Sequence, residues 1–170
     1  MKDLDKNISL IWRSKNNKDD LKTIYKLANF CRKNKRNLIL SNNVKLALKL
    51  KLNGAYISAH NKDYRFNSYK FRKNFKLIGS AHNIIEVNVK KAQKINEIFI
   101  SPIFKYKNKS PLGIHRIRYF FEDNSYNKIA LGGINEKNIN LLSLVKFSGF
   151  AGISLFKKKG PKKWGPFFNI

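Results

Sequence analysis

The chain is short of acidic side chains, cysteine and long hydrophobic runs, and each shortage excludes a class of protein. Ten aspartates and glutamates stand against 36 lysines and arginines, which gives a formal net charge of +26 over 170 residues. Cys31 is the single cysteine, so an internal disulfide is excluded and a cytoplasmic location is favoured. No apolar run approaches 18 residues, so the sequence predicts no membrane span. Residues 1–6 lack the apolar centre of a signal peptide.

The excess of positive charge has two interpretations. A strongly basic surface attracts phosphate, which favours nucleic acid or an anionic membrane as the partner. The alternative is a general enrichment in lysine over every solvated face. Only seven of the 36 basic residues are arginine, the residue that suits bidentate contacts to nucleic acid, and basic residues occur along the whole chain. Nucleic acid therefore stays open as a partner but is not favoured, and the oligomeric state also stays open.

Short apolar runs alternate with segments of helical spacing. The runs predict seven strands at residues 8–12, 38–40, 55–57, 75–78, 98–100, 129–131 and 151–155. Helices are expected at about 19–33 and 44–52, from Ile84 through Ala92, and from Asn138 through Val145. This alternation is typical of βαβ units and predicts an α/β fold with a parallel sheet.

No linker-like composition or internal repeat divides the chain. We therefore expect a single domain over residues 1–170, with a basic aromatic tail at about 157–170. The tail could touch phosphate or membrane, but packing or disorder is the favoured interpretation because proline and glycine interrupt it.

Small and polar residues follow three of the predicted strands. They occupy residues 78–83 (Ile-Gly-Ser-Ala-His-Asn), 100–104 (Ile-Ser-Pro-Ile-Phe, leading to Lys109) and 130–135 (Ala-Leu-Gly-Gly-Ile-Asn). In a (β/α) barrel such loops meet at the carboxyl ends of the strands, where the chemistry takes place. His82 can exchange a proton near neutral pH, although a lone histidine is more often structural. Gly132 and Gly133 would let the backbone approach an anion, although a tight turn explains them equally well.

Together the three segments resemble the thiamine phosphate synthase/TenI family, TIM barrels that act on thiazole phosphate in thiamine biosynthesis. The resemblance covers about residues 8–157 and is best from residue 75 onward. It implies a TIM-type (β/α) barrel. Residues 8–15 resemble the family's second strand, so the first strand and helix are expected to be missing from a divergent, N-terminally short member.

The resemblance also implies roles for individual residues. His82 stands where the TenI branch has its acid/base, and Ser80 stands where the family has a serine facing the pyrophosphate leaving group. The implied substrate- and phosphate-binding residues are Arg13, Lys15, Lys109, Gly132, Gly133 and Lys157. Arg13 and Lys15 would hold the pyrimidine pyrophosphate, and Lys157 would replace by its charge a serine that the family uses at the phosphate.

Two departures from the family concern magnesium. Asn42 and Asn61 stand at the positions of the family's Mg²⁺-binding aspartates. Replacing two carboxylates by amides removes two formal charges from a site that needs anionic oxygen. We therefore expect no metal ligands, and Mg²⁺ as a cofactor only if the synthase reaction persists.

Three functions remain open. The first is a thiamine phosphate synthase that joins thiazole phosphate and hydroxymethylpyrimidine pyrophosphate, both small phosphorylated substrates, and Arg13, Lys15, Ser80 and Lys109 favour it. The second is a TenI-like, metal-independent thiazole tautomerase, which Asn42 and Asn61 favour. The third is a non-catalytic basic binding protein derived from this barrel, which would account for the charge and the lost carboxylates.

Overall fold

The computed structural model describes residues 8–14, 20–106, 108, 110–120 and 124–152. Seven parallel strands form one sheet, and their order in the sheet is their order along the chain. They are β1 (Leu10–Trp12), β2 (Leu38–Ser41), β3 (Gly54–Ile57), β4 (Lys76–Ala81), β5 (Glu97–Ile100), β6 (Asn127–Leu131) and β7 (Gly149–Ala151). The predicted seven-stranded α/β fold is confirmed.

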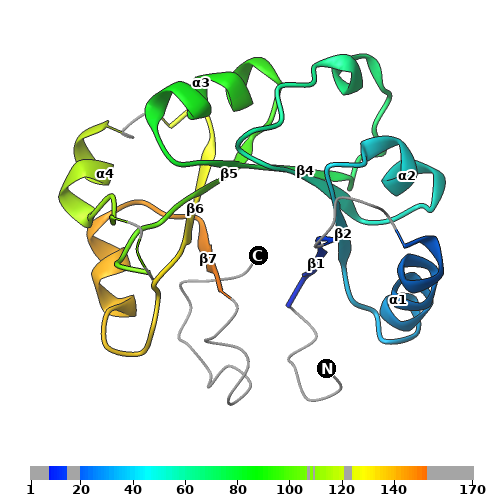
Figure 1. Ribbon diagram of the computed structural model, residues 1–170, viewed down its shortest axis with the longest axis horizontal. Helices are drawn as coiled ribbons and strands as arrows, with labels where there is room; N and C mark the ends of the chain where they lie inside the picture. The colour runs from blue at the N-terminus through cyan, green and yellow to red at the C-terminus, as the bar shows by residue number, and fades with distance from the viewer. Residues whose placement is uncertain (1–7, 15–19, 107, 109, 121–123, 153–170) are drawn as a thin grey trace.

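The sheet is curled into an open half-barrel with β1 and β7 at its two ends (Figure 1). Four helices cover the convex side: α1 (Leu21–Lys33), α2 (Val44–Lys49), α3 (Ile84–Ala92) and α4 (Ile114–Phe120). Two 3₁₀ helices, η1 (Arg65–Ser68) and η2 (Ile139–Leu144), complete the described elements. Across the described ranges, no helix is long and apolar enough to cross a membrane.

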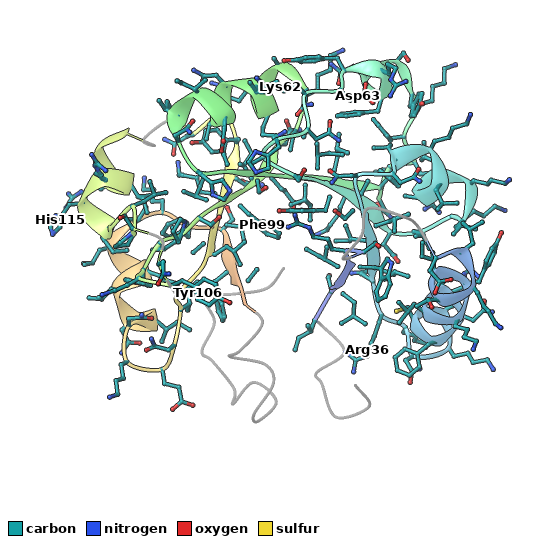
Figure 2. The ribbon with its side chains drawn as sticks, viewed as in Figure 1. Arg36, Lys62, Asp63, Phe99, Tyr106 and His115 are labelled. Atoms are coloured by element: carbon teal, nitrogen blue, oxygen red, sulfur yellow. The ribbon has the colours of Figure 1, made fainter. Side chains whose placement is uncertain are left out.

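The two faces of the sheet bury different side chains because successive residues of a strand point in opposite directions. On the convex face, residues such as Leu40, Ile57 and Ile98 pack in the larger core together with the helices. The concave face carries a second, smaller cluster of Ile39, Tyr56, Ile78, Phe99 and Ile129, and Figure 2 shows Phe99 on this inner side. This layer fills the half-barrel below the carboxyl ends of the strands and forms the base of any site there.

Short polar side chains set the starts of three helices. Asp20, Asn43 and Asn83 are the N-caps of α1, α2 and α3, and the side chain of each accepts a hydrogen bond from a backbone N–H in the first turn. Such caps satisfy donors that have no partner inside the helix. They fix where each helix begins after its strand.

Several boundaries differ from the sequence prediction. The helix predicted at 44–52 ends at Lys49, because Leu50 is its C-cap and Lys51 adopts a left-handed φ of 53°. The helix expected from Asn138 onward is the 3₁₀ helix η2. The Asn138 side chain accepts a hydrogen bond from the Asn135 N–H and donates one to the Gly133 carbonyl, and such side-chain bonds compete with those of a regular α-helix. β7 begins two residues earlier than predicted; residues 153–155 and the tail at 157–170 lie outside the described residues.

Candidate active site at the carboxyl ends of the strands

A buried pair of hydroxyls lies inside the half-barrel. The Tyr56 hydroxyl on β3 donates a hydrogen bond to Ser80 Oγ on β4 at 2.8 Å, and the two residues are only 8% and 3% exposed. The Phe99 ring packs against Tyr56 with ring centroids 5.7 Å apart. Because Ser80 accepts from Tyr56, its own hydroxyl hydrogen can be donated to an oxygen of a ligand.

His82 follows the end of β4, and its ring is oriented by the neighbouring strand. Its Nδ1 lies 2.6 Å from the backbone oxygen of Ser101 and 3.2 Å from Ser101 Oγ, just beyond β5. A carbonyl oxygen only accepts, so Nδ1 carries the hydrogen. In the neutral ring Nε2 is then unprotonated and can take a proton from a ligand.

The first turn of α3 fixes the backbone of His82. Glu86 Oε2 accepts from the His82 N–H at 2.6 Å, while the side chain of Asn83 accepts from the Glu86 N–H at 2.9 Å. This reciprocal arrangement is similar to a capping box, in which a residue of the first turn reaches back to the residues before the helix. Contacts within residues 82–86 therefore fix the backbone of His82, whereas Ser101 orients its ring.

His60 is a rim residue that the sequence analysis did not select. It lies in the loop after β3, and its ring centroid is 6.4 Å from that of His82. The available signal was its place shortly after a strand, although His60 is the third residue beyond β3 whereas His82 directly follows β4. His115, in contrast, is exposed on α4 at the outside of the half-barrel (Figure 2).

The two asparagines that the resemblance assigns to magnesium positions, Asn42 and Asn61, come together. Asn61 Nδ2 donates to Asn42 Oδ1 at 3.4 Å, and the same oxygen accepts the Ser58 N–H at 2.9 Å. Asn42 adopts a left-handed φ of 56°, which asparagine tolerates, and its N–H donates to the Tyr56 carbonyl at 2.7 Å. The loops after β2 and β3 are therefore joined by a hydrogen bond between two side-chain amides.

This amide pair does not fit Mg²⁺. The ion is bound by one or two carboxylates, and here a neutral oxygen already accepts from two donors. Within the part of the chain that the structure describes, no group of three histidine, cysteine, aspartate or glutamate residues is placed to hold a metal ion. We derive no reaction step through magnesium.

A buried lysine supports the loop that carries Asn61. Lys90 Nζ on α3 donates to the Asn61 carbonyl at 2.7 Å and to Gln93 Oε1 at 2.9 Å, while Gln93 Nε2 reaches the carbonyls of Asn61 and Asp63. Burial lowers the pKa of Lys90 to about 8, and the nearby Glu86 carboxylate acts in the opposite direction. Hydrogen bonds from α3 and from its C-cap residue Gln93 thus hold this loop.

Gly132 and Gly133 allow the segment at residues 130–135 to contact the segment at residues 100–104. Their φ angles are +92° and +72°, and a Cβ would lie 2.9 Å from Pro102 Cα at Gly132 and 2.6 Å from the Phe104 carbonyl oxygen at Gly133. The Phe104 N–H also donates to the Gly132 carbonyl at 3.1 Å. Glycine is therefore required by the close approach of the β5–α4 loop to the end of β6.

Replacing Gly133 with alanine is expected to destabilise the fold more than the same change at Gly113. Both glycines have a positive φ, +72° and +74°, which costs an alanine about 1–2 kcal/mol. A Cβ at Gly113 meets nothing within 4 Å, whereas at Gly133 it overlaps backbone atoms. In urea unfolding, Gly133→Ala should lower the free energy of unfolding by about 1 kcal/mol or more beyond the loss in Gly113→Ala. Equal losses would show that the β5–α4 loop can move aside.

The predicted cationic residues are only partly within the described structure. Arg13 is exposed one residue beyond the end of β1. Lys15, Lys109 and Lys157 lie outside the described residues, so of the predicted phosphate-binding set the structure describes Arg13, Gly132 and Gly133.

Comparisons with known proteins identify the family that the chain resembles. The family model TMP-TENI, described as thiamine monophosphate synthase, matches residues 6–156. Thiamine-phosphate synthase of Prochlorococcus marinus subsp. pastoris (strain CCMP1986 / NIES-2087 / MED4) is 30% identical over 152 residues, which are 86% of this chain and 43% of that protein. The enzyme of the same name from Prochlorococcus marinus (strain AS9601) is 29% identical, over 85% of this chain and 42% of that protein. The chain thus spans less than half the length of these curated relatives.

Solved structures share the fold. Thiamine phosphate pyrophosphorylase from Pyrococcus furiosus gives a TM-score of 0.67 at 15% identity, covering 85% of this chain and 71% of that one. Thiamine phosphate pyrophosphorylase from Bacteroides thetaiotaomicron gives 0.55 at 19% identity, covering 94% and 76%. With the family model matching most of its length, the chain belongs to the thiamine monophosphate synthase family.

Proposed function

We propose that the protein joins thiazole phosphate to hydroxymethylpyrimidine pyrophosphate, forming thiamine phosphate and releasing pyrophosphate. The observation that carries this proposal is the family match over residues 6–156, which includes the strand ends that bear Ser80, His82, Gly132 and Gly133. The activity named for the curated relatives comes to this chain as a proposal, because less than half of their length is covered.

In this reaction the bond between the pyrimidine methylene carbon and the pyrophosphate oxygen breaks, and the electron pair leaves with pyrophosphate. The thiazole nitrogen then supplies the pair for the new C–N bond. The Ser80 hydroxyl, which accepts from Tyr56, would donate its hydrogen to an oxygen of the leaving group. A fixed donor in a buried site stabilises the charge that develops there.

Positively charged side chains would stabilise the rest of the negative charge on the departing pyrophosphate. We assign Arg13, Lys15 and Lys109 to the pyrophosphate. Gly132, Gly133 and Lys157 would bind the phosphate of the thiazole. Since the neutral Asn42–Asn61 pair does not fit Mg²⁺, these cations would take over charge stabilisation in this chain.

The test is a turnover assay with purified protein, thiazole phosphate and hydroxymethylpyrimidine pyrophosphate, in Mg²⁺ and in EDTA. We expect thiamine phosphate to form in both conditions at rates within about threefold of each other, because the site has no carboxylate pair for the ion. Product in neither condition would contradict the synthase proposal and leave the tautomerase or the non-catalytic binding protein.

A second function is favoured by the orientation of His82. With Nδ1 bonded to the Ser101 carbonyl, Nε2 is a base that could move a proton on a thiazole tautomer without a metal. This is the reaction of the TenI branch. Aromatisation of the tautomer in the absence of thiamine phosphate formation would support it over the synthase.

Restoring both carboxylates should create a magnesium response that the natural chain lacks. In the double variant Asn42→Asp, Asn61→Asp, two like charges replace an amide hydrogen bond, so we expect a lower Tm in EDTA. Bound Mg²⁺ would stabilise this variant by about 2.7 kcal/mol at 100 times its Kd. Thermal unfolding with and without Mg²⁺ measures the difference, with Asn61→Asp alone as the control. An equal response in the unaltered chain would contradict our account of the amide pair.

Cellular location and domain organisation stay predictions. The lone Cys31 favours the cytoplasm, and the composition favours one domain over residues 1–170. Fractionation of cells that express the full chain, and limited proteolysis of the purified protein, would test these two expectations.

A further inference from the structure

The four connections that lead from a helix into β2, β3, β4 and β5 carry positive charge and no acidic residue. They comprise residues 34–37, 50–53, 69–75 and 93–96. Their exposed cations are Lys35, Lys51, Lys70, Arg72, Lys73 and Lys94. Because the strands are parallel, these connections lie together at the amino ends, at the opposite end of β4 from His82.

The connections at the carboxyl ends of the strands have a mixed charge instead. Among the described residues that connect each strand to the helix after it, the cations are Arg13, Lys62, Lys105 and Lys137, and the acids are Asp20, Asp63 and Glu136. The two ends of the sheet therefore differ in charge. A general enrichment in lysine over every solvated face does not explain this difference.

Hydrogen bonds join the first three of the positively charged connections. Arg32 Nη2, near the end of α1, donates to the Leu50 carbonyl at 2.7 Å. Arg72 Nη2, in the connection to β4, donates to the Leu52 carbonyl at 2.6 Å. Lys51 stands between these two accepting residues, so segments from three connections meet around it.

A cavity of about 770 Å³ lies among these connections and has an aromatic ring in its lining. Lys73 and Lys94 line it together with Phe71 and Phe75, whose stacked rings have centroids 5.2 Å apart and an interplanar angle of 10°. Phe71 is 36% exposed and stands between two cations in the sequence. Cations beside an exposed ring are the combination with which proteins hold single-stranded nucleic acid, through phosphate contacts and base stacking.

Three of the lysines occupy positions where glycine is the favoured residue. Lys35, Lys51 and Lys94 directly follow the C-caps of α1, α2 and α3, and their φ angles are 51°, 53° and 57°. Glycine adopts this left-handed backbone without strain and is the usual residue there. The helix dipole favours a cation near a helix C-terminus, but basic residues in the last turn of each helix already provide one. The dipole therefore does not account for lysine at all three positions.

We propose that the amino ends of β2 to β5 bind the phosphate backbone of single-stranded nucleic acid. Lys35, Lys51 and Lys94 would contact phosphates, and a base would stack on Phe71. Binding would tolerate any base sequence, because lysine meets phosphate as a point charge and every base can stack on a ring. An anionic membrane fits less well, since it needs an apolar face and Phe71 is the one exposed large hydrophobic residue of the four connections described here.

The test replaces the three left-handed lysines together, as Lys35→Gly, Lys51→Gly, Lys94→Gly in the full chain. Because glycine suits this backbone, we expect a Tm equal to or above that of the unaltered chain. The affinity for a labelled oligouridylate of about twelve residues should fall about tenfold or more in about 50 mM salt. The slope of log affinity against log salt concentration should become shallower by about two, since each lost phosphate contact contributes about 0.7. Fluorescence anisotropy measures both quantities.

The matched control removes the same charge near the carboxyl ends of the strands, with glutamine in place of the exposed Lys45, Lys62 and Lys137. This variant should lose less than about threefold in affinity, because its lysines lie outside the proposed surface. Phe71→Ala should weaken binding about fivefold or more, as loss of a stacking contact does.

Equal losses in the two triple variants would show that net charge alone attracts the oligonucleotide and would overturn the proposal. The absence of saturable binding in about 50 mM salt, or an unchanged affinity in Phe71→Ala, would overturn it as well. Tighter binding to phosphatidylcholine vesicles with about 30% phosphatidylserine, lost in the glycine variant, would assign the surface to a membrane instead. The glycine variant should form thiamine phosphate within about twofold of the unaltered chain, so this outcome is separate from that of the proposed synthase.

Discussion

Replacing Ser80 with alanine is expected to lower kcat for thiamine phosphate formation by about 100-fold. The Ser80 hydroxyl is buried, accepts from Tyr56 at 2.8 Å and has its own hydrogen left for the departing pyrophosphate. The Kd for thiazole phosphate should change less than about twofold, because we assign that substrate to Gly132, Gly133 and Lys157. Steady-state kinetics and calorimetry of the variant measure the two quantities.

Tyr56 provides the control for this prediction. Ser80→Ala leaves the Tyr56 hydroxyl buried without its acceptor, which costs about 1–3 kcal/mol of stability. The double variant Ser80→Ala, Tyr56→Phe removes both groups and should recover most of that stability without recovering kcat. A kcat that returns with stability would show that Ser80 has only a structural role.

Replacing His82 with glutamine is expected to separate the two candidate reactions. Proton transfer on a thiazole tautomer should slow by about 10²- to 10⁴-fold, because glutamine cannot accept a proton where Nε2 does. Thiamine phosphate formation should fall less than about tenfold, since its bond-breaking step is assigned to Ser80 and the cations. Both activities can be followed by product analysis on the same protein preparation.

His60→Gln is the matched control for His82. Its ring centroid lies 6.4 Å from that of His82, but among the residues that the structure describes no backbone carbonyl orients its ring. Its removal should change the tautomer reaction less than about threefold. If His60→Gln is the more damaging change, the acid/base belongs to the loop after β3 and not to the end of β4.

Much of the fold follows from local sequence. The apolar runs predict all seven strands because each is bounded by polar or small residues, and the β2 residues 38–40 and β5 residues 98–100 fall inside the observed strands. Asn83 marks the start of α3 because its short side chain caps the helix. The end of α2 and the 3₁₀ form of η2 were not predicted, because competing hydrogen bonds and a left-handed residue decide them.

The site is harder to predict from the sequence than the fold, because its contacts join residues from different strands. Ser80 and His82 are recognisable because they follow the strand predicted at 75–78. Their partners Tyr56 and Ser101 lie 24 and 19 residues away and meet them only through the pairing of β3 with β4 and of β4 with β5. His60 also follows a strand, but its proximity to His82 arises from the pairing of β3 with β4, which the sequence does not show.

Periodicity and residue identity predict the parallel α/β architecture and the family, and the resemblance implies that Asn42 and Asn61 stand in place of two carboxylates. The tertiary structure alone decided that Asn42 and Asn61 bond each other, that Gly133 is packed against Phe104, and that Lys90 is buried under the site. A lysine on a helix is ordinarily exposed. The burial of Lys90 follows from the space that Gly79 leaves on β4 and from the Asn61 carbonyl, which accepts a hydrogen bond from its ammonium group. These features depend on the register of the sheet and on backbone atoms brought together by it, which no local pattern encodes.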